Sequence, residues 1–251
     1  ARRRGVRVVL LEQGERLCRR SLPASIAARL QALHEAHGVE IRLNTEVVGF
    51  AGEARVRHAA LSDGSALAVG AVVVGIGAAP DLHFVRQAQL AVRQGIVVDA
   101  LGRSADPFIY AAGDVAETRC EWQNMPVRYE CWASANHQAQ VAADSMLRDQ
   151  ARADLPASAP APVPWFWSDQ YDASLQIAGA PLLADACEAI ADDAQGFAHG
   201  FYRGGRLIGA VAIGHARAFR DLRRRIEPIK PPSCRPAPAT IPSQPPKGTM
   251  P

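Results

Sequence analysis

Short apolar runs alternate with glycine and charged residues along the chain, a spacing typical of a mixed α/β protein. The first run, residues 5–12, is continuous and ends in the carboxylate of Glu12, as expected of a buried parallel strand. Residues 23–37 carry apolar side chains at helical spacing and stop before Gly38, which predicts an amphipathic helix. Residues 39–43 alternate as a strand should. The chain therefore opens with a strand, a helix and a second strand.

Further short strands are predicted at residues 47–50, 54–61 and 67–74, with Ser62–Ser65 as the turn between two of them. Within the last of these, residues 71–74 are a continuous apolar run and should form a buried strand. Such a strand would deliver the loop that follows it to the carboxyl end of a sheet, where ligands bind in α/β proteins.

Another strand is expected through residues 104–112, an apolar stretch that runs into small residues and ends at Gly113 and Asp114. A helix is predicted over residues 134–147, which are rich in helix formers and carry alanines and a leucine for burial. The four prolines and many alanines of residues 151–164 predict a stiff linker.

The last part of the chain repeats a strand pattern and then changes character. Strands are predicted at residues 175–178, 197–202 and 207–213, with a hairpin turn at Gly204-Gly205 and a basic helix over residues 215–226. From residue 228 onward the composition is Pro, Ser and Thr with few large apolar residues, which predicts disorder.

These elements predict an α/β fold with partial Rossmann-like domains followed by a small α+β domain. We expect a partial nucleotide-binding domain at 1–81, the carboxyl-terminal part of a second such domain at 82–150, a linker at 151–164, a small α+β domain at 165–227 and a disordered tail at 228–251.

Composition narrows the class of protein. The 251 residues include 28 basic and 25 acidic side chains, a balance that gives no support to nucleic-acid binding. No apolar run reaches the ~18 residues that a transmembrane helix needs. The five cysteines have no metal-ligand spacing and are odd in number, which favours a reducing compartment and hence the cytoplasm. The seven histidines likewise have no ligand spacing, so no metal site is expected.

Glu12 is the first candidate for ligand binding. In a dinucleotide-binding unit the acidic residue at the end of the second strand binds the adenosine ribose hydroxyls. A carboxylate about 4 Å from a 2′-phosphate would be repelled by roughly 4 kcal/mol at an intermediate dielectric, so Glu12 favours NADH over NADPH. Arg16, Arg19 and Arg20 point the other way, because arginines after this strand are what a 2′-phosphate site uses.

Gly113 and Asp114 are the second candidate. A glycine lets the backbone approach a bulky ligand, and a carboxylate at the end of a strand accepts hydrogen bonds from sugar-like hydroxyls such as those of a flavin's ribityl-phosphate arm. By itself the Gly-Asp pair also fits a plain turn. No classical catalytic constellation accompanies it, as expected where a flavin supplies the chemistry.

Five runs of residues have a characteristic order and spacing: the strand ending in Glu12, GIGAAPD at 75–81, YAAGD at 110–114, RYECW at 128–132 and PWFWSDQY at 164–171. Together they resemble the ferredoxin reductase branch of the FAD-dependent pyridine nucleotide oxidoreductases. The resemblance covers roughly residues 1 to 225, and PWFWSDQY is its most specific string.

The resemblance implies roles for individual residues. It places Ile76 and Gly77 against the NAD cofactor, Trp132 beside the flavin with Glu130 bracing the turn, and Trp165 near the nicotinamide site. It also implies that the amino end of the helix at 134–147 points at the flavin. Plain core or interface packing remains open for the tryptophans. Trp165 and Trp167 alternate along a strand-like segment, so we expect them on opposite sides.

The function implied is hydride transfer from NADH to FAD, followed by single-electron transfer to a ferredoxin-type iron–sulfur protein. A rubredoxin or nitrite reductase flavoprotein subunit is an alternative enzyme, and a non-catalytic remnant acting as an interaction module is an alternative of another class. Arg223, Arg224 and Arg225 either steer an acidic partner or form a solvated helix face. Whether the protein is a homodimer stays open.

The amino end suggests a fragment. Ala1–Gly5 resembles the last turn of a helix, cationic at its carboxyl end and stopped by glycine. The glycine-rich turns that bind the pyrophosphate groups of the two dinucleotides would lie before it. We therefore expect the chain alone to bind neither FAD nor NADH tightly.

Overall fold

The computed structural model describes residues 1–120, 125–151 and 162–226. The chain opens with a 3-10 turn at Arg2–Arg4 that ends at Gly5, whose φ is 72°. Strand β1 (Val9–Leu11) then pairs in parallel with β2 (Glu40–Arg42), and helix α1 (Ala24–Ala36) connects them. The predicted strand–helix–strand pattern is confirmed, although β1 is shorter than the apolar run that contains it.

A three-stranded antiparallel sheet follows, with β3 (Val47–Ala51), β4 (His58–Leu61) and β5 (Ala66–Ala68) in that order. The predicted turn between the last two strands is confirmed, and Gly64 has the positive φ, 83°, that a tight turn uses.

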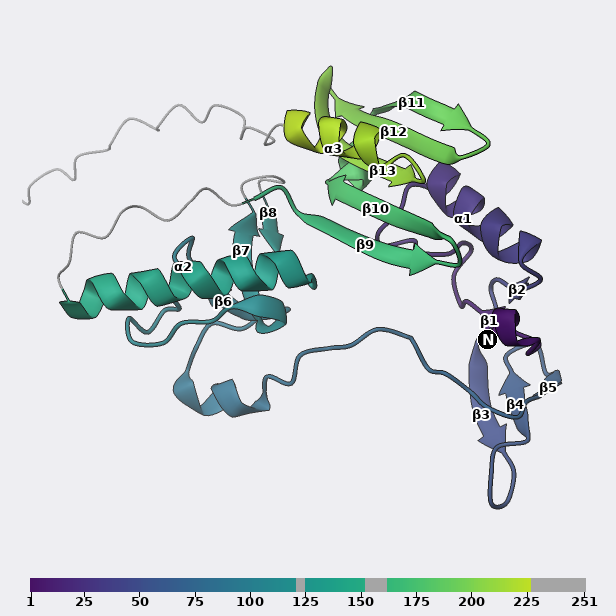
Figure 1. Cartoon of the computed structure of the whole chain (residues 1–251). Coiled ribbons are helices and arrows are strands. Elements are labelled where there is room, and N and C mark those ends of the chain that lie inside the picture. Colours follow the sequence, from purple (N-terminus) through teal and green to yellow (C-terminus); the bar gives the residue numbers. More distant parts are fainter. Residues whose placement is uncertain (121–124, 152–161, 227–251) are drawn as a thin grey trace, which may run out of the picture.

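The prediction of a buried strand at residues 71–74 is wrong. Residues 71–79 are all exposed, and Val73 is 96% accessible to solvent. A parallel strand forms only where neighbours satisfy its backbone and cover both of its faces. Within the described parts of the chain, no strand pairs with this segment. In Figure 1 it belongs to the long extended connection between β5 and the elements around α2.

The middle of the chain forms a second small unit. Strand β6 (Ile96–Val98) runs parallel to β7 (Ala116–Cys120), which pairs antiparallel with β8 (Met125–Val127). Helix α2 (Trp132–Ala151) confirms the predicted helix and extends it at both ends. Sequence patterns missed these three short strands.

The strand expected through residues 104–112 is also wrong. The segment makes a single bridge, between Arg103 and Tyr110, and Gly113–Val115 form a 3-10 turn. Local side chains compete for its backbone: the Asp106 carboxylate accepts the N–H of Phe108 at 2.8 Å, and the Ser104 hydroxyl accepts the N–H of Asp106 at 3.2 Å. Such bonds favour turns over ladders.

The last unit is a five-stranded antiparallel sheet with a helix. Its strands are β9 (Trp165–Gln170), β10 (Ala173–Gly179), β11 (Ala186–Asp193), β12 (Gly196–Arg203) and β13 (Arg206–Ile213), in the order β11-β12-β13-β10-β9. Helix α3 (Ala216–Arg225) confirms the predicted basic helix. The predicted turn at Gly204-Gly205 joins β12 to β13. Most of the expected linker and the whole of the expected tail lie outside the described residues.

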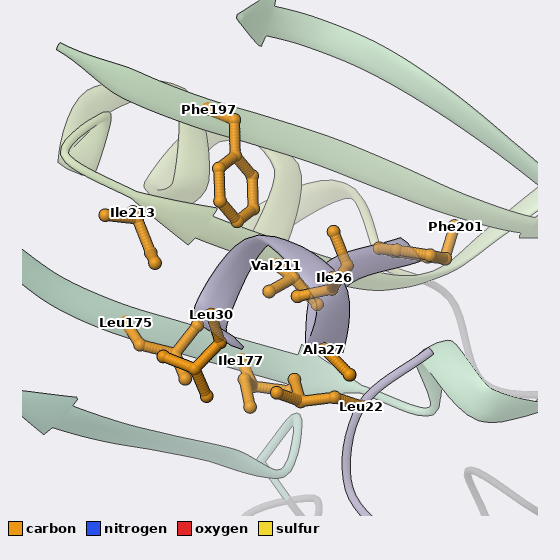
Figure 2. Packing of buried hydrophobic residues seen from close by; sticks show 10 residues of the cluster. All are labelled: Leu22, Ile26, Ala27, Leu30, Leu175, Ile177, Phe197, Phe201, Val211 and Ile213. Atoms are coloured by element: carbon orange, nitrogen blue, oxygen red, sulfur yellow. The ribbon is translucent and has the colours of Figure 1, made fainter. Parts of the chain in front are cut away.

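Helices bury both faces of this sheet. Figure 2 shows α1 lying on one face, where Ile26 and Leu30 meet side chains from β10, β12 and β13. The full set of this cluster is Leu22, Ile26, Ala27, Leu30, Leu175, Ile177, Phe197, Phe201, Val211 and Ile213. On the opposite face, Phe219 and Leu222 of α3 pack against Ala178, Ala198 and Ala210. The small domain thus takes one of its two covering layers from the amino-terminal part of the chain.

Polar contacts fix α1 on the sheet. The Arg29 guanidinium donates two hydrogen bonds to the Asp192 carboxylate, at 2.6 and 2.7 Å, and lies 4.4 Å from the centre of the Phe197 ring. This pair lowers the pKa of Asp192 and raises that of Arg29. Bidentate pairing of this kind adds geometric specificity to the apolar contact.

Tyr171 fastens the carboxyl end of α1. It sits at the β9–β10 turn with a positive φ of 57°, its ring stacks on His37 at 3.6 Å, and its hydroxyl bonds His34 Nδ1 at 2.8 Å. Burial, and secondarily His37, lowers the pKa of His34. Tyr171, the last residue of the PWFWSDQY run, therefore links the β9–β10 turn to the end of α1.

We predict that Leu30→Ala lowers the free energy of unfolding by about 2 to 5 kcal/mol, because it leaves a cavity between α1 and the sheet. Urea denaturation of the chain measures this loss. Gln31→Ala, on the same helix but outside the apolar cluster, is the matched control. A loss no larger than the control's would contradict the packing described.

The lowered pKa of His34 predicts a pH dependence. The unfolded chain takes up this proton first, near pH 6.5, so the contribution of neutral His34 is complete above that pH and is lost as pH falls through the folded-state value. Between pH 7.5 and 5, the unfolding free energy should fall less steeply in His34→Gln than in the wild type. Gln31→Ala, on the same helix and without a titratable group, should keep the wild-type slope; equal slopes in all three would refute the assignment.

Candidate functional site

Glu12 lies directly after β1 and is half-buried. Its Oε1 accepts the N–H of Gly14 at 2.8 Å, while its backbone N–H donates to the carbonyl of Arg42 at 3.0 Å. Its own carbonyl accepts the N–H of Thr45 at 3.0 Å. The carboxylate is thereby held at the carboxyl end of a parallel strand, where an α/β sheet binds ligands.

The three arginines after Glu12 have different surroundings. Arg16 donates to the carbonyl of Leu22 at 2.7 Å and to that of Arg19 at 3.2 Å, so its guanidinium braces the loop that carries it. Arg19 and Arg20 are exposed. Of the three, Arg16 is therefore the one occupied with backbone contacts rather than free for a phosphate.

The structure brings Arg20 to the GIGAAPD loop. Its Nη2 lies 3.1 Å from where a Cβ on Gly77 would stand, and Gly77 has a φ of 95° that disfavours any side chain there. Neighbouring Ile76 is 90% exposed. Two candidate residues far apart in sequence thus meet, with open space around the loop.

Cys18 lies in the loop between Glu12 and α1 and has a positive φ of 51°. Burial, followed by the Glu12 carboxylate, raises the pKa of its thiol, whereas Arg16 acts in the opposite direction. The thiol is therefore protonated at neutral pH and is a poor nucleophile.

Gly113 and Asp114 form a turn beside the amino-terminal part of α2. Gly113 has a φ of 77°, and its N–H donates to Gln138 Oε1 at 2.7 Å. The carbonyl of Asp114 accepts from Arg128 Nη1 at 3.0 Å, and the residue itself is exposed. Both backbone sides of the turn are held while its carboxylate faces solvent.

Glu130 and Trp132 complete this cluster. The Arg128 guanidinium pairs with the exposed Glu130 carboxylate, and Trp132, the first residue of α2, is 73% exposed. The Arg128 Nε atom is buried and has no hydrogen-bond partner among the described residues. The candidate flavin residues therefore gather around the amino end of α2, where the helix dipole favours negative charge.

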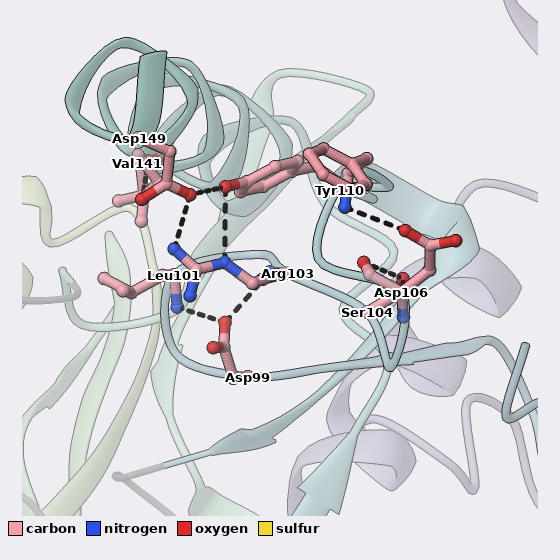
Figure 3. Close-up of polar contacts among 10 residues, drawn as sticks. Asp99, Leu101, Arg103, Ser104, Asp106, Tyr110, Val141 and Asp149 are labelled. Carbon is pink, nitrogen blue, oxygen red and sulfur yellow. Dashed lines mark hydrogen bonds and ion pairs between the residues drawn. The ribbon is translucent and has the colours of Figure 1, made fainter. Parts of the chain in front are cut away.

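A second network ties the YAAGD run to the other end of α2. Figure 3 shows Arg103, Tyr110 and Asp149 bonded to one another: Arg103 Nη2 donates to Asp149 at 2.6 Å, Arg103 Nε donates to the Tyr110 hydroxyl at 3.3 Å, and that hydroxyl donates to Asp149. Hydrogen bonding from Tyr110, with Arg103 beside it, lowers the pKa of Asp149. The YAAGD run is thus bonded to α2 at two places, through Gly113 to Gln138 and through Tyr110 to Asp149.

Trp165 and Trp167 lie on the same side of β9, which corrects the prediction of opposite sides. Their rings stack with centroids 4.8 Å apart, because residues two apart in a strand share a face. The Arg223 guanidinium lies 4.4 Å from the centre of the Trp165 ring, and burial lowers the pKa of Arg223. Trp165 packs against the cluster beneath α3, and its buried Nε1 has no partner in the described chain.

Sequence reasoning missed Gln138, Arg128 and Tyr110 as parts of the site. Arg128 and Tyr110 stand inside the RYECW and YAAGD runs, so the motifs themselves were the available signal. Gln138 lies on the expected helix, and only the fold shows which of its polar residues faces the turn.

The described residues include no group of three or more His, Cys, Asp and Glu residues suited to a metal ion. None of the described helices is both long enough and apolar enough to cross a bilayer.

Comparison with known proteins identifies the class. Residues 1–139 match the pyridine nucleotide-disulphide oxidoreductase family, and residues 165–237 match the reductase C-terminal family. The chain belongs to the pyridine nucleotide-disulphide oxidoreductases. Its C-terminal match indicates the ferredoxin reductase type, so the resemblance noted in the sequence is confirmed.

Solved structures agree with this assignment. The chain is similar to putidaredoxin reductase in its covalent complex with putidaredoxin, at 27% identity and a TM-score of 0.80, over 88% of this chain and 53% of that one. It is also similar to the ferredoxin reductase for the CYP199A2 system from Rhodopseudomonas palustris, at 30% identity and a TM-score of 0.76, over 85% and 52%. Fdr9 matches at 30% identity and a TM-score of 0.78, over 89% and 56%.

The chain therefore spans about half the length of the solved reductases that it matches. The expected fold class, partial Rossmann-like domains followed by a small α+β domain, is confirmed. FAD and NAD(H) are confirmed as the cofactors of the family.

Proposed function

We propose that the complete gene product containing this chain passes a hydride from NADH to FAD and then single electrons to a ferredoxin-type iron–sulfur protein. One observation carries the proposal: the Gly113–Asp114 turn is held on both sides beside α2 while its carboxylate stays exposed. Similarity, at 27–30% identity, to putidaredoxin reductase and to the ferredoxin reductase for the CYP199A2 system supports it.

The residues around α2 fit a flavin. A Cβ on Gly113 would approach only Ala135, at 3.6 Å, so the backbone is open to a ligand. Exposed Asp114 is a ready acceptor for sugar hydroxyls, and the positive end of α2 suits a ring that gains negative charge. When bound, FAD accepts a hydride and releases electrons singly. The protein's own contribution is to bind, orient and electrostatically stabilise.

The residues around Glu12 fit NADH better than NADPH. The carboxylate stands at the strand end where ribose hydroxyls bind. Arg16, which would otherwise favour a 2′-phosphate, donates to two backbone carbonyls. Arg20 lies beside Gly77 and is available to a phosphate elsewhere in the dinucleotide.

An acidic iron–sulfur partner would meet a basic α3. Of the ten residues of α3, five are arginines and one is an aspartate. At the end of α3, Arg223 lies over the Trp165 ring, whereas Arg224 and Arg225 are exposed and could attract an acidic partner. A cytoplasmic location and a homodimer remain predictions.

We predict that Asp114→Ala in the complete gene product weakens FAD binding by about 1.5 to 3 kcal/mol, because a charge-assisted acceptor is lost. The flavin-to-protein ratio after dialysis measures this. Asp144→Ala, elsewhere on α2, where the carboxylate accepts a hydrogen bond from Gln140, is the control. Full flavin retention in Asp114→Ala would contradict the assignment.

Glu12→Gln should shift cofactor preference toward NADPH. It keeps the acceptor that binds the Gly14 N–H and removes the charge that repels a 2′-phosphate. The ratio of kcat/KM for NADH to that for NADPH should fall, while Glu15→Gln in the same loop leaves it unchanged. An unaltered ratio in Glu12→Gln would remove Glu12 from the ribose site.

A further inference from the structure

Gln138 faces the Gly113–Asp114 turn from α2. Its Oε1 accepts the N–H of Gly113 at 2.7 Å, across 25 residues of sequence. Ala135, three residues earlier and therefore on the same helix face, lies 3.6 Å from the Cβ position of Gly113. A small side chain and a hydrogen-bond acceptor together let the turn sit directly against the helix.

The turn needs such support because its conformation is unusual. With a φ of 77°, Gly113 occupies the left-handed region, and its N–H bonds a side chain of α2. A buried or half-buried N–H without a partner is destabilising, so the acceptor of Gln138 selects this conformation over others open to glycine. The next residue along the chain is Asp114.

A second side chain restrains the other side. Arg128 donates to the carbonyl of Asp114 at 3.0 Å and has a side chain only 14% exposed. Its aliphatic part packs where Gly95 lacks a side chain: a Cβ there would stand 3.1 Å from Arg128 Cδ. Gln138 thus holds the peptide group before Gly113, the Ala116 N–H bonds the Gly113 carbonyl, and Arg128 holds the peptide group after Asp114. The backbone is therefore held on both sides of Asp114, which sets the direction in which its Cα–Cβ bond leaves the turn.

We propose that Gln138 is a positioning residue for the flavin site, acting through Gly113 to hold the Asp114 carboxylate in its ligand-binding direction. This inference rests on the proposed function for the identity of the ligand. Gln138 itself need not touch the flavin. The pairing with Gly113 is a property of the chain without any ligand.

The test uses Gln138→Met, which keeps the length of the side chain and removes the acceptor. Hydrogen exchange of the Gly113 amide, followed by NMR on the chain without flavin, should become on the order of tenfold faster, as expected for one lost hydrogen bond. Gln138→Glu, which restores an acceptor, should restore protection. Gln140→Met, which loses its bond to Asp144 on the same helix, is the control.

Flavin binding by the complete gene product then tests the positioning role. Gln138→Met should raise the Kd for FAD on the order of tenfold in the wild-type background. In an Asp114→Asn background the same substitution should change the Kd by less than about twofold, because the group it positions is already altered. A merely structural role would give equal losses in both backgrounds and would overturn the proposal.

The two measurements separate this inference from the proposed function. Unchanged exchange of the Gly113 amide in Gln138→Met overturns the positioning role whatever the protein binds. Absence of flavin binding by the wild-type gene product overturns the proposed function, while amide exchange still decides whether Gln138 fixes the turn.

Discussion

Burial of α1 against the five-stranded sheet is the contact on which the arrangement of this chain depends. The helix belongs by sequence to the strand–helix–strand unit that carries Glu12, yet its apolar face lies on strands more than 130 residues later. Ile26 is completely buried there, and the bidentate Arg29–Asp192 pair adds a directional contact between the helix and the sheet. Without α1, one face of the sheet would expose a contiguous apolar surface.

α2 has a comparable role for the other half of the chain. It contacts the YAAGD run through Gln138 near its beginning and through Asp149 near its end. The residues of the YAAGD run have little secondary structure of their own, so their conformation comes from bonds to these α2 side chains rather than from a strand ladder. A turn built in this way is placed by a rigid helix, which gives it more precision than a free loop has.

Sequence patterns predicted the elements that carry their own signals: α1, α2, α3, the β12–β13 hairpin and the cofactor family. They failed where partners decide the outcome. Residues 71–74 have the composition of a strand but no strand beside them in the described chain, and residues 104–112 lose their ladder to Ser104 and Asp106. Candidate residues Glu12, Gly113 and Asp114 were identifiable by motif. Gln138 was not, because helix residues that face a distant turn look like any other polar residue.

The loop from Gln13 to Leu22 joins the Glu12 carboxylate at the end of β1 to the apolar cluster of the small domain. Glu12 precedes the loop, and Arg16 donates within it to the carbonyls of Arg19 and Leu22. Buried Leu22 ends the loop in the cluster beneath α1. A ligand that displaces this loop must therefore break both Arg16 bonds or slide α1 across the sheet. A displacement of Glu12 that moved this loop would therefore disturb the packing of α1 on the sheet, because Leu22 is buried in the cluster between them.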